Sequence, residues 1–347
     1  DLRCCHWANK SCLAPHFVMS RVLIQCKRYA GAYQQLNRWH EMDVTPWRFI
    51  AASLTLGFQR FPEVLQAGPR LWLHRLGLGF SGAAYLADVY GQLCLTGDHA
   101  NLDASEKGAM SYWQGMVLAK LAAAEILGIR WLQHADAMEK RGVLIRTQRP
   151  LPRGRRNPRA DKRADMAGQD DTGGWHIIEA KGFSSHPGLP AFEKAKTQAG
   201  MVASINQTVP LTTTGCVASL WKTPIEIVMD DPPPVGNEFW SIPHQAFWQD
   251  YYGGLADYIR GSKRLKTSTD QPGFTFASLS PLLGLLPLKD RQKDWQAPMI
   301  GLPDDILADP TKAPKLLPRL FAKGPLDRVA EDGVALIGTI GDWTAMT

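Results

Sequence analysis

Trp175-His176-Ile177-Ile178-Glu179-Ala180-Lys181, in a chain of 347 residues, is the segment from which the central sheet can be predicted. Its largely apolar beginning, residues 175–178, predicts a buried strand. Alternate side chains of a strand point to the same face, so Glu179 and Lys181 are expected to lie side by side. Two opposite charges at the end of a buried strand require either a structural partner or a function.

A second carboxylate is expected opposite this strand end. Residues 163–167 also read as a strand, and the turn-rich residues 168–174 can join the two strands into a hairpin. Such a hairpin brings Asp165 across from Glu179, so two carboxylates and the ammonium group of Lys181 converge at one sheet edge. The combination suits phosphodiester hydrolysis, in which the carboxylates of Asp165 and Glu179 hold Mg²⁺ and a lysine orients the attacking water. A structural ion pair between Asp165 and Lys181 is the alternative.

The surrounding elements predict a mixed α/β core over residues 103–230. A helix is expected after Asp103, with Glu106 in the capping-box position and Gly128 at its end. Further strands are expected at residues 142–146, 214–221 and 225–229, and a helix at residues 190–206. The predicted order is helix, three strands, helix, two strands.

The two flanks are predicted from periodicity and turn signals. Residues 1–102 read as a mainly helical N-terminal region, with helix-like periodicity at residues 48–58 and 83–95 and few alternating strands. The Asp-Asp-Pro-Pro-Pro run at residues 230–234 marks a boundary. Residues 231–347 read as an α+β C-terminal accessory region, with an aromatic helix at 238–259 and a last strand at 334–340.

These residues resemble the PD-(D/E)xK, or restriction-endonuclease-like, nuclease superfamily. Asp165, Glu179, Ala180 and Lys181 stand where the family's acidic and Glu-x-Lys residues would, and the element order agrees. The family's proline position holds Ala164 here. The resemblance implies a restriction-endonuclease-like mixed sheet flanked by helices, with Asp165, Glu179 and Lys181 as catalytic residues and Asp165 and Glu179 as metal ligands.

The resemblance also implies contributions from helices. The helix after the hairpin often adds a polar residue to the site, and Gln198, which shares a face with Lys194, is the better match and joins the catalytic set. A glutamate on the preceding helix is common in the family, and both Glu106 and Glu125 are candidates. For Glu106 the capping-box role is the alternative.

Positive charge is concentrated just before Asp165. The chain carries a net charge of +6, whereas residues 146–163 alone carry +7. This segment should draw a phosphate backbone towards the acidic edge, although a merely solvated loop is the alternative. The residues expected to contact nucleic acid are Arg149, Arg153, Arg155, Arg156, Arg159 and Arg163.

The function expected from these observations is a Mg²⁺-dependent nuclease, with Mn²⁺ as a possible substitute. The resemblance favours a DNA endonuclease in restriction, phage defence or a toxin effector, although the residues themselves do not exclude RNA. A catalytically silent module that binds nucleic acid or a protein is the alternative. The flanks are expected to select the substrate, a protein partner or a second copy of the chain.

Other signals are weaker. Residues 77–82 match G-x-G-x-x-G, the fingerprint of a dinucleotide-dependent oxidoreductase, but no buried strand precedes them, so a glycine turn between helices is expected. Residues 4–16 hold three cysteines and two histidines without the usual zinc spacing. Six cysteines, no signal-peptide pattern and no apolar run of about 20 residues predict a cytoplasmic protein without a membrane span.

Overall fold

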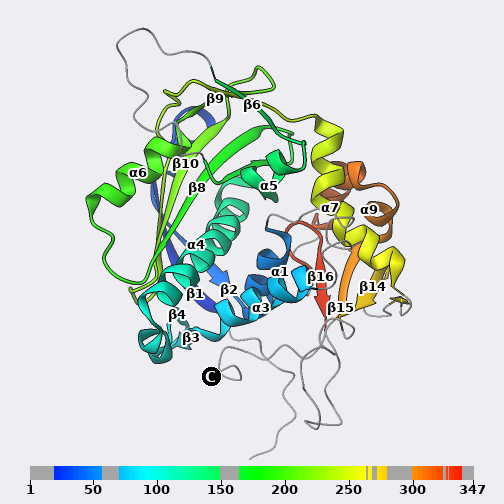
Figure 1. The fold of residues 1–347 in the computed structure, drawn as a ribbon, viewed down its shortest axis with the longest axis horizontal. Coiled ribbons are helices and arrows are strands. Elements are labelled where there is room, and N and C mark those ends of the chain that lie inside the picture. The colour runs from blue at the N-terminus through cyan, green and yellow to red at the C-terminus, as the bar shows by residue number, and fades with distance from the viewer. Residues whose placement is uncertain are drawn as a thin grey trace, which may run out of the picture.

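The computed structural model describes residues 19–56, 70–148, 164–262, 265–267, 272–279, 299–322, 326 and 328–337. Their main element is a nine-stranded mixed sheet, flanked by helices (Figure 1). Along it, the strands follow the order β3 (Leu86–Val89), β4 (Gln92–Leu95), β1 (Ser20–Lys27), β11 (Glu226–Asp230), β10 (Thr212–Ser219), β8 (Trp175–Phe183), β7 (Met166–Gln169) and β5 (Trp131–His134), and β2 (Trp39–Val44) pairs with β1.

The half of this sheet from β10 to β5 contains the predicted hairpin. β5 pairs antiparallel with β7, and β7 pairs antiparallel with β8. β8 and β10 run parallel, so the chain must cross over between them, and α6 (Leu189–Ala199) makes that crossover. α4 (Ala104–Leu127) precedes β5 in the sequence. Along the chain, the elements that form or flank this half of the sheet are therefore α4, then β5, β7 and β8, then α6, then β10.

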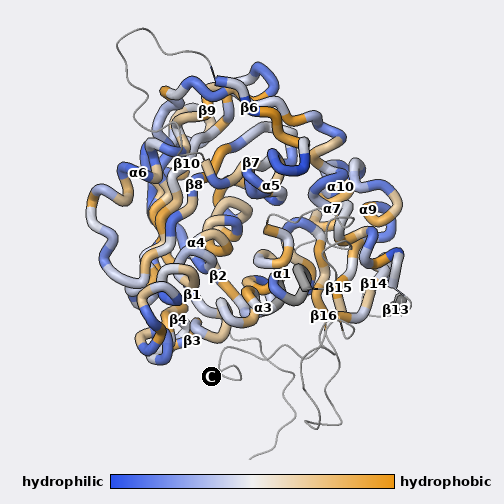
Figure 2. The backbone as a smooth tube through the Cα atoms, in the orientation of Figure 1, coloured by the Kyte–Doolittle hydropathy of each residue, from blue (hydrophilic) through white to orange (hydrophobic). Residues whose placement is uncertain are grey.

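The helix α4 begins and ends where its sequence predicts. The Asp103 carboxylate accepts from the backbone N–H groups of Ser105 and Glu106, and the Glu106 carboxylate accepts from the backbone N–H of Asp103, which is the predicted capping box. Gly128 ends the helix with a φ of +68°, a conformation that favours glycine. In Figure 2 the second half of α4 is mostly hydrophobic, and hydrophilic segments lie towards the rim.

Glycines let α4 approach β8 closely. A Cβ atom added to Gly115 of α4 would lie 2.5 Å from the backbone N of Gly182, and one added to Gly182 would lie 1.9 Å from the backbone O of Ser111. Neither position has room for a side chain. The helix therefore rests directly on the strand that carries Glu179 and Lys181.

In the centre of the chain, one strand was not predicted and another lies in a different sheet from the one expected. β5, at residues 131–134, is the first strand of the large sheet after α4. It was not predicted, because four residues are too few to show a periodic pattern of apolar side chains. The strand expected at residues 142–146 is β6 (Ile145–Gln148), which lies in a separate sheet with β12 (Glu238–Ser241) and β9 (Val202–Ile205). This small sheet joins residues on both sides of the predicted boundary at residue 230.

The N-terminal region has more strands than expected. Helix α1 (Pro46–Thr55) confirms the helix expected near residues 48–58. The helix expected at residues 83–95 is wrong, because α3 (Arg70–Ala84) ends there and β3 and β4 form a hairpin through Tyr90 and Gly91, both at positive φ. β1 lies inside the large sheet between β4 and β11, so this sheet continues across the predicted boundary at residue 102.

The C-terminal region is α+β, as predicted. It contains α7 (His244–Gly261), α9 (Asp304–Ala308), α10 (Ala313–Leu320) and a four-stranded sheet of β13 (Leu265–Thr267), β14 (Phe274–Ser278), β15 (Met299–Pro303) and β16 (Ala335–Ile337). A buried polar cluster ties it to α4, where Lys120 Nζ lies 2.7 Å from Tyr251 Oη and 3.1 Å from Asp332 Oδ2. Among the described residues, no helix has the length and apolar character of a membrane span.

Candidate active site

Asp165 and Glu179 face each other at the end of the β7–β8 hairpin. Met166 pairs with Ile178, and continuing this antiparallel register places Asp165 opposite Glu179. The backbone N–H of Asp165 donates to Glu179 Oε2 over 2.9 Å, and the backbone N–H of Ala180 donates to Asp165 Oδ2 over 3.0 Å. The predicted juxtaposition of the two carboxylates is therefore present.

Lys181 completes the group. Its Nζ atom donates to Glu179 Oε1 and lies 3.5 Å from Asp165 Oδ2. The Glu179 side chain is fully buried, whereas those of Asp165 and Lys181 are 16% and 20% exposed. Solvent therefore reaches the cluster beside Asp165 and Lys181, with Glu179 behind them.

The electrostatics of this cluster favour an additional cation. Burial, together with the charge of Asp165, raises the pKa of Glu179 to about 8 although Lys181 opposes the rise. Burial alone would lower the pKa of Lys181, but the two carboxylates outweigh it and raise the value. Among the residues described, the ammonium group of Lys181 is thus the one positive charge beside the carboxyl groups of Asp165 and Glu179. Ionising both carboxyl groups costs free energy in this partly buried position, and a bound cation would reduce that cost.

The donor set also suits a hard cation. Carboxylate oxygens are preferred ligands of Mg²⁺, which commonly takes one or two of them and keeps several waters. In the described part of the chain, no group of three or more His, Cys, Asp or Glu side chains is arranged to hold a metal ion. Asp165 and Glu179 could hold Mg²⁺ together with water, substrate or backbone oxygens as its remaining ligands.

A short strand holds the backbone of Asp165 in place. The backbone N–H of Ala135, directly after β5, donates to the carbonyl O of Asp165 over 2.8 Å. Asp165 itself lies one residue before β7, not within a strand as predicted. Ala164, at the family's proline position, is buried. Neither β5 nor this hydrogen bond was predicted.

Helix α6 covers the face of the sheet from which the Glu179 side chain projects. Gly215 of β10 pairs with Glu179, and a Cβ atom added to Gly215 would lie 2.9 Å from the backbone N of Lys196. Paired residues of neighbouring strands point to the same face, so α6 and Glu179 share a side of the sheet. Gln198 is buried on this helix, and its predicted part in the site stays a prediction. The helix ends at Ala199, earlier than the predicted residue 206.

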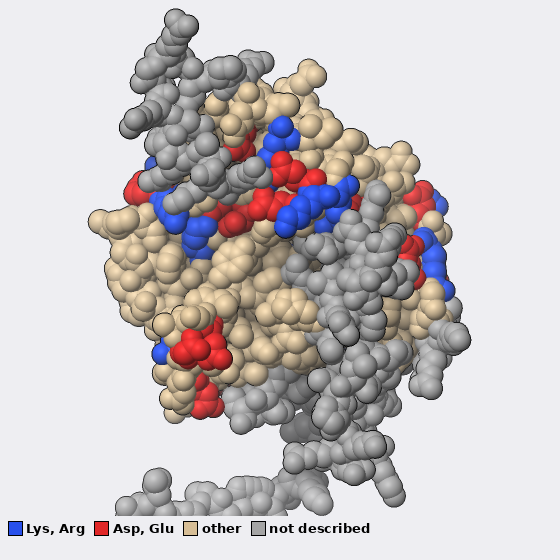
Figure 3. Space-filling view, in the orientation of Figure 1, with Lys and Arg blue, Asp and Glu red and all other residues tan. Residues whose placement is uncertain are grey.

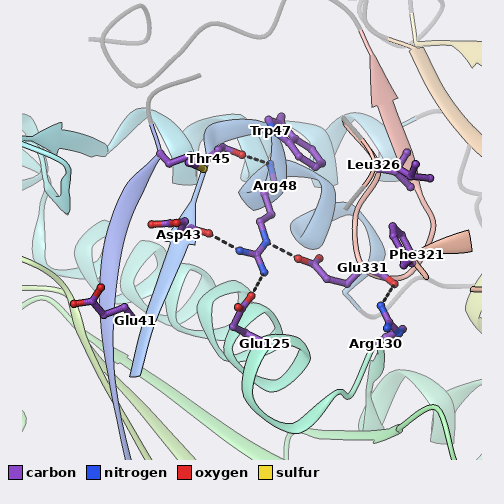
Figure 4. A pocket seen from close by; sticks show the side chains of 12 residues that line it. Glu41, Asp43, Thr45, Trp47, Arg48, Glu125, Arg130, Phe321, Leu326 and Glu331 are labelled. Carbon is purple, nitrogen blue, oxygen red and sulfur yellow. Dashed lines mark hydrogen bonds and ion pairs between the residues drawn. The ribbon is translucent and has the colours of Figure 1, made fainter. Parts of the chain in front are cut away.

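Both candidate glutamates of the preceding helix have other partners. Glu106 closes the capping box at the start of α4, the alternative given for it. Glu125, near the end of α4, accepts from Arg48 Nη2 over 2.8 Å, and Figure 4 shows Arg48 between Glu125 and Glu331 in a separate pocket. Neither glutamate is part of the Asp165 cluster.

The predicted basic approach lies mostly outside the described residues. This holds for Arg149, Arg153, Arg155, Arg156, Arg159 and Arg163. The side chain of Arg146, at the start of the basic segment, is only 7% exposed and pairs with Asp136 over 3.0 Å. Its guanidinium carbon lies 4.8 Å from the centroid of the Trp240 ring. It is therefore not available to a phosphate. On the face shown in Figure 3, the described basic side chains stand beside acidic ones.

The glycine fingerprint at residues 77–82 lies within α3, so both the dinucleotide loop and the expected turn are wrong. Gly79 and Gly82 instead allow α3 to pack on α1, because added Cβ atoms would lie 2.6 Å from Ser53 Oγ and 3.0 Å from Phe49 Cε1. The cysteines and histidines of residues 4–16 lie outside the described residues.

Comparisons with known proteins add no relative to this description. No family model, no curated protein and no solved structure matches the chain. The assignment of a function therefore depends on the residues and the geometry given above.

Proposed function

We propose that the chain is a Mg²⁺-dependent nuclease with its active site at Asp165, Glu179 and Lys181. The observation that carries the proposal is the convergence of these three side chains at the end of the β7–β8 hairpin. The order of α4, β5, β7, β8, α6 and β10 supports it, because it agrees with the order expected of the restriction-endonuclease-like fold.

Each residue has a part that its position allows. Asp165 and Glu179 would hold Mg²⁺, with Mn²⁺ as a substitute. When bound, the cation would supply Lewis-acid stabilisation of the charge on the scissile phosphate. Lys181, partly exposed beside Asp165, would orient the attacking water and stabilise developing negative charge. Gln198 on α6 would help to position Lys181 or the water.

The substrate is proposed from the same resemblance. We expect DNA, cut internally, because the resembled superfamily acts mainly on DNA, and we expect the arginines between residues 149 and 163 to contact its backbone. Restriction, phage defence and toxin activity are the settings in which such a nuclease would serve.

A substrate panel tests the proposal. Purified chain is incubated with plasmid, single-stranded DNA and RNA in Mg²⁺ or in EDTA. We expect plasmid cleavage in Mg²⁺ only, and a loss of about 100-fold or more in Asp165→Asn, since single groups of this kind commonly contribute that much. Equal cleavage by Asp165→Asn would refute the site.

The contacts of Lys181 with Glu179 and Asp165 also favour a second candidate function. Lys181 already bonds Glu179 and lies near Asp165, as it would in a nuclease-like module that binds nucleic acid or a protein without cutting. Tight nucleic-acid binding without metal-dependent cleavage of any substrate in the panel would favour this candidate over the nuclease.

A further inference from the structure

A cleft of about 650 Å³ lies where β8 ends beside the first turns of α4. Its walls come from four parts of the chain: the segment after β4 with the 3-10 helix η2 (Gly97–Asn101), the start of α4, the end of β8, and Trp221 after β10. This volume is in the usual range of small-ligand pockets.

Three buried polar atoms of the cleft residues have no hydrogen-bond partner among the described residues. They are Thr96 Oγ1, His99 Nε2 and Ser111 Oγ. His99 is only 3% exposed and Ser111 only 4%. Buried polar atoms are nearly always hydrogen-bonded, so three such atoms around one cleft indicate groups that serve a ligand.

The other walls suit a flat ring. Phe183 and Trp221 line the cleft, and Trp221 is 42% exposed. The His186 ring lies 5.6 Å from the Trp221 ring, and Lys222 Nζ lies 5.6 Å from its centroid. An exposed tryptophan beside a lysine is a usual stacking surface for nucleobases.

The charge and hydrogen-bonding capacity narrow the ligand class. The described residues that line the cleft include Lys107 but no aspartate or glutamate. Hydroxyl groups can donate or accept, and neutral imidazole can do either according to its tautomer. Burial and the charge of Lys107 lower the pKa of His99, which keeps its ring neutral near pH 7. The matching ligand is a flat heterocycle with both donors and acceptors at its edge and a nearby negative charge.

We propose that this cleft binds an unpaired nucleobase together with its phosphate. The base stacks on Trp221 and bonds the buried atoms of Thr96, His99 and Ser111, while the phosphate lies near Lys107. The proposal rests on the proposed nuclease function, because the cleft lies at the end of β8, the strand that carries Glu179 and Lys181. Gly182, which lines the cleft, lies on the α4 face of β8, opposite the face of Glu179 and Lys181. In this proposal the base belongs to a nucleic-acid strand that passes around the end of β8. A free nucleotide offers the same chemistry, so the test includes both sources.

Calorimetric titration of the full chain in EDTA tests this binding without cleavage. The probes are a single-stranded oligonucleotide of mixed sequence and the four deoxynucleoside monophosphates. In Thr96→Val/Ser111→Ala, two lost hydrogen bonds should weaken binding about tenfold. Ser53→Ala is the matched control, because Ser53 Oγ is also buried without a partner among the described residues but lies at the α1–α3 contact. It should bind as the parent does.

The outcomes separate the two proposals. Weakened oligonucleotide binding in the double variant, with an unchanged melting temperature, supports the base site, and equally tight binding of a monophosphate identifies a free nucleotide as its ligand. If the double variant binds every probe as the parent does, or the parent binds none, the cleft proposal is overturned. Mg²⁺-dependent cleavage is measured in parallel. The nuclease proposal depends only on whether Asp165→Asn loses this cleavage, and not on the binding results.

Discussion

Asp165 and Glu179 hold each other through the backbone, since the N–H of Asp165 donates to Glu179 Oε2 over 2.9 Å and the N–H of Ala180 donates to Asp165 Oδ2 over 3.0 Å. Each carboxylate is thus fixed by the main chain of the opposite strand. Its position depends on the hairpin register rather than on a flexible side-chain contact. Changes that loosen the hairpin should therefore disturb the candidate site.

The hairpin turn provides the first prediction. Asp170 Oδ1 accepts from the N–H groups of Thr172 and Gly174 at 2.9 Å each, and Asp170 Oδ2 lies 3.3 Å from His176 Nε2. We expect Asp170→Asn to lower the free energy of unfolding at pH 7 by about 1–3 kcal/mol, because bonds to an ionised acceptor are lost or weakened. Urea denaturation measures this change, and no change would contradict the role of the turn.

The same residue gives a pH dependence. Burial alone would raise the pKa of Asp170, but its bonds to His176, Thr172 and Gly174 outweigh burial and hold the pKa well below its usual value of 3.8. The stabilisation is then fully present above the unfolded-state pKa and is lost as pH falls below it. The stability difference between the parent and Asp170→Asn should shrink between about pH 5 and pH 2. A constant difference over this range would contradict the assignment.

The contact between α4 and β8 gives a steric prediction. A side chain at Gly182 would meet the backbone O of Ser111 at 1.9 Å, so Gly182→Ala should destabilise the chain by about 1–3 kcal/mol or more. Gly253 of α7 has no atom within 4 Å of its added Cβ, and Gly253→Ala should leave stability unchanged or raise it by up to about 1 kcal/mol. Thermal melting of both variants checks the contrast, and similar melting temperatures would contradict it.

The buried cation of α4 gives a fourth prediction. Lys120 bonds Tyr251 and Asp332 in the interior, and burial lowers the pKa of Lys120 despite Asp332. Lys120→Met leaves Asp332 without its counter-charge and should cost about 3–5 kcal/mol, whereas Lys120→Met/Asp332→Asn should cost less.

Arg260→Ala is the control for this pair. It removes an ion pair with Asp257 in which both side chains are nearly half exposed, and it should cost less than about 1 kcal/mol. Denaturant unfolding of the three variants measures these differences. A double variant less stable than Lys120→Met would argue against a buried charge pair.

Local signals were sufficient for part of the fold. The apolar run before Glu179 and the glycine-rich turn predicted the hairpin, and Asp103 with Glu106 predicted the start of α4. These features depend on residues close in sequence. For the same reason, the convergence of Asp165, Glu179 and Lys181 could be predicted before the structure.

Long-range pairing explains most of what was missed. β1 pairs parallel with β11, where Leu23 lies opposite Glu226, and no local pattern specifies a partner so distant in sequence. The apolar residues at alternate positions of β1, Val22, Ile24 and Cys26, are a sequence signal of a strand. This signal does not indicate which strand β1 pairs with. The cleft beside α4 likewise joins His99, Ser111 and Trp221 from separate elements, so only the folded chain brings them together.

Plasmid cleavage by Lys181→Ala shows whether Lys181 serves catalysis or only a structural ion pair. Lys181 touches both carboxylates, whereas Lys315 is exposed on α10 and serves as the matched control in Lys315→Ala. With Mg²⁺, we predict that the parent and Lys315→Ala cut plasmid, that Lys181→Ala cuts about 100-fold more slowly or worse, and that EDTA stops all cleavage. Equal cleavage by Lys181→Ala and the parent would contradict the account.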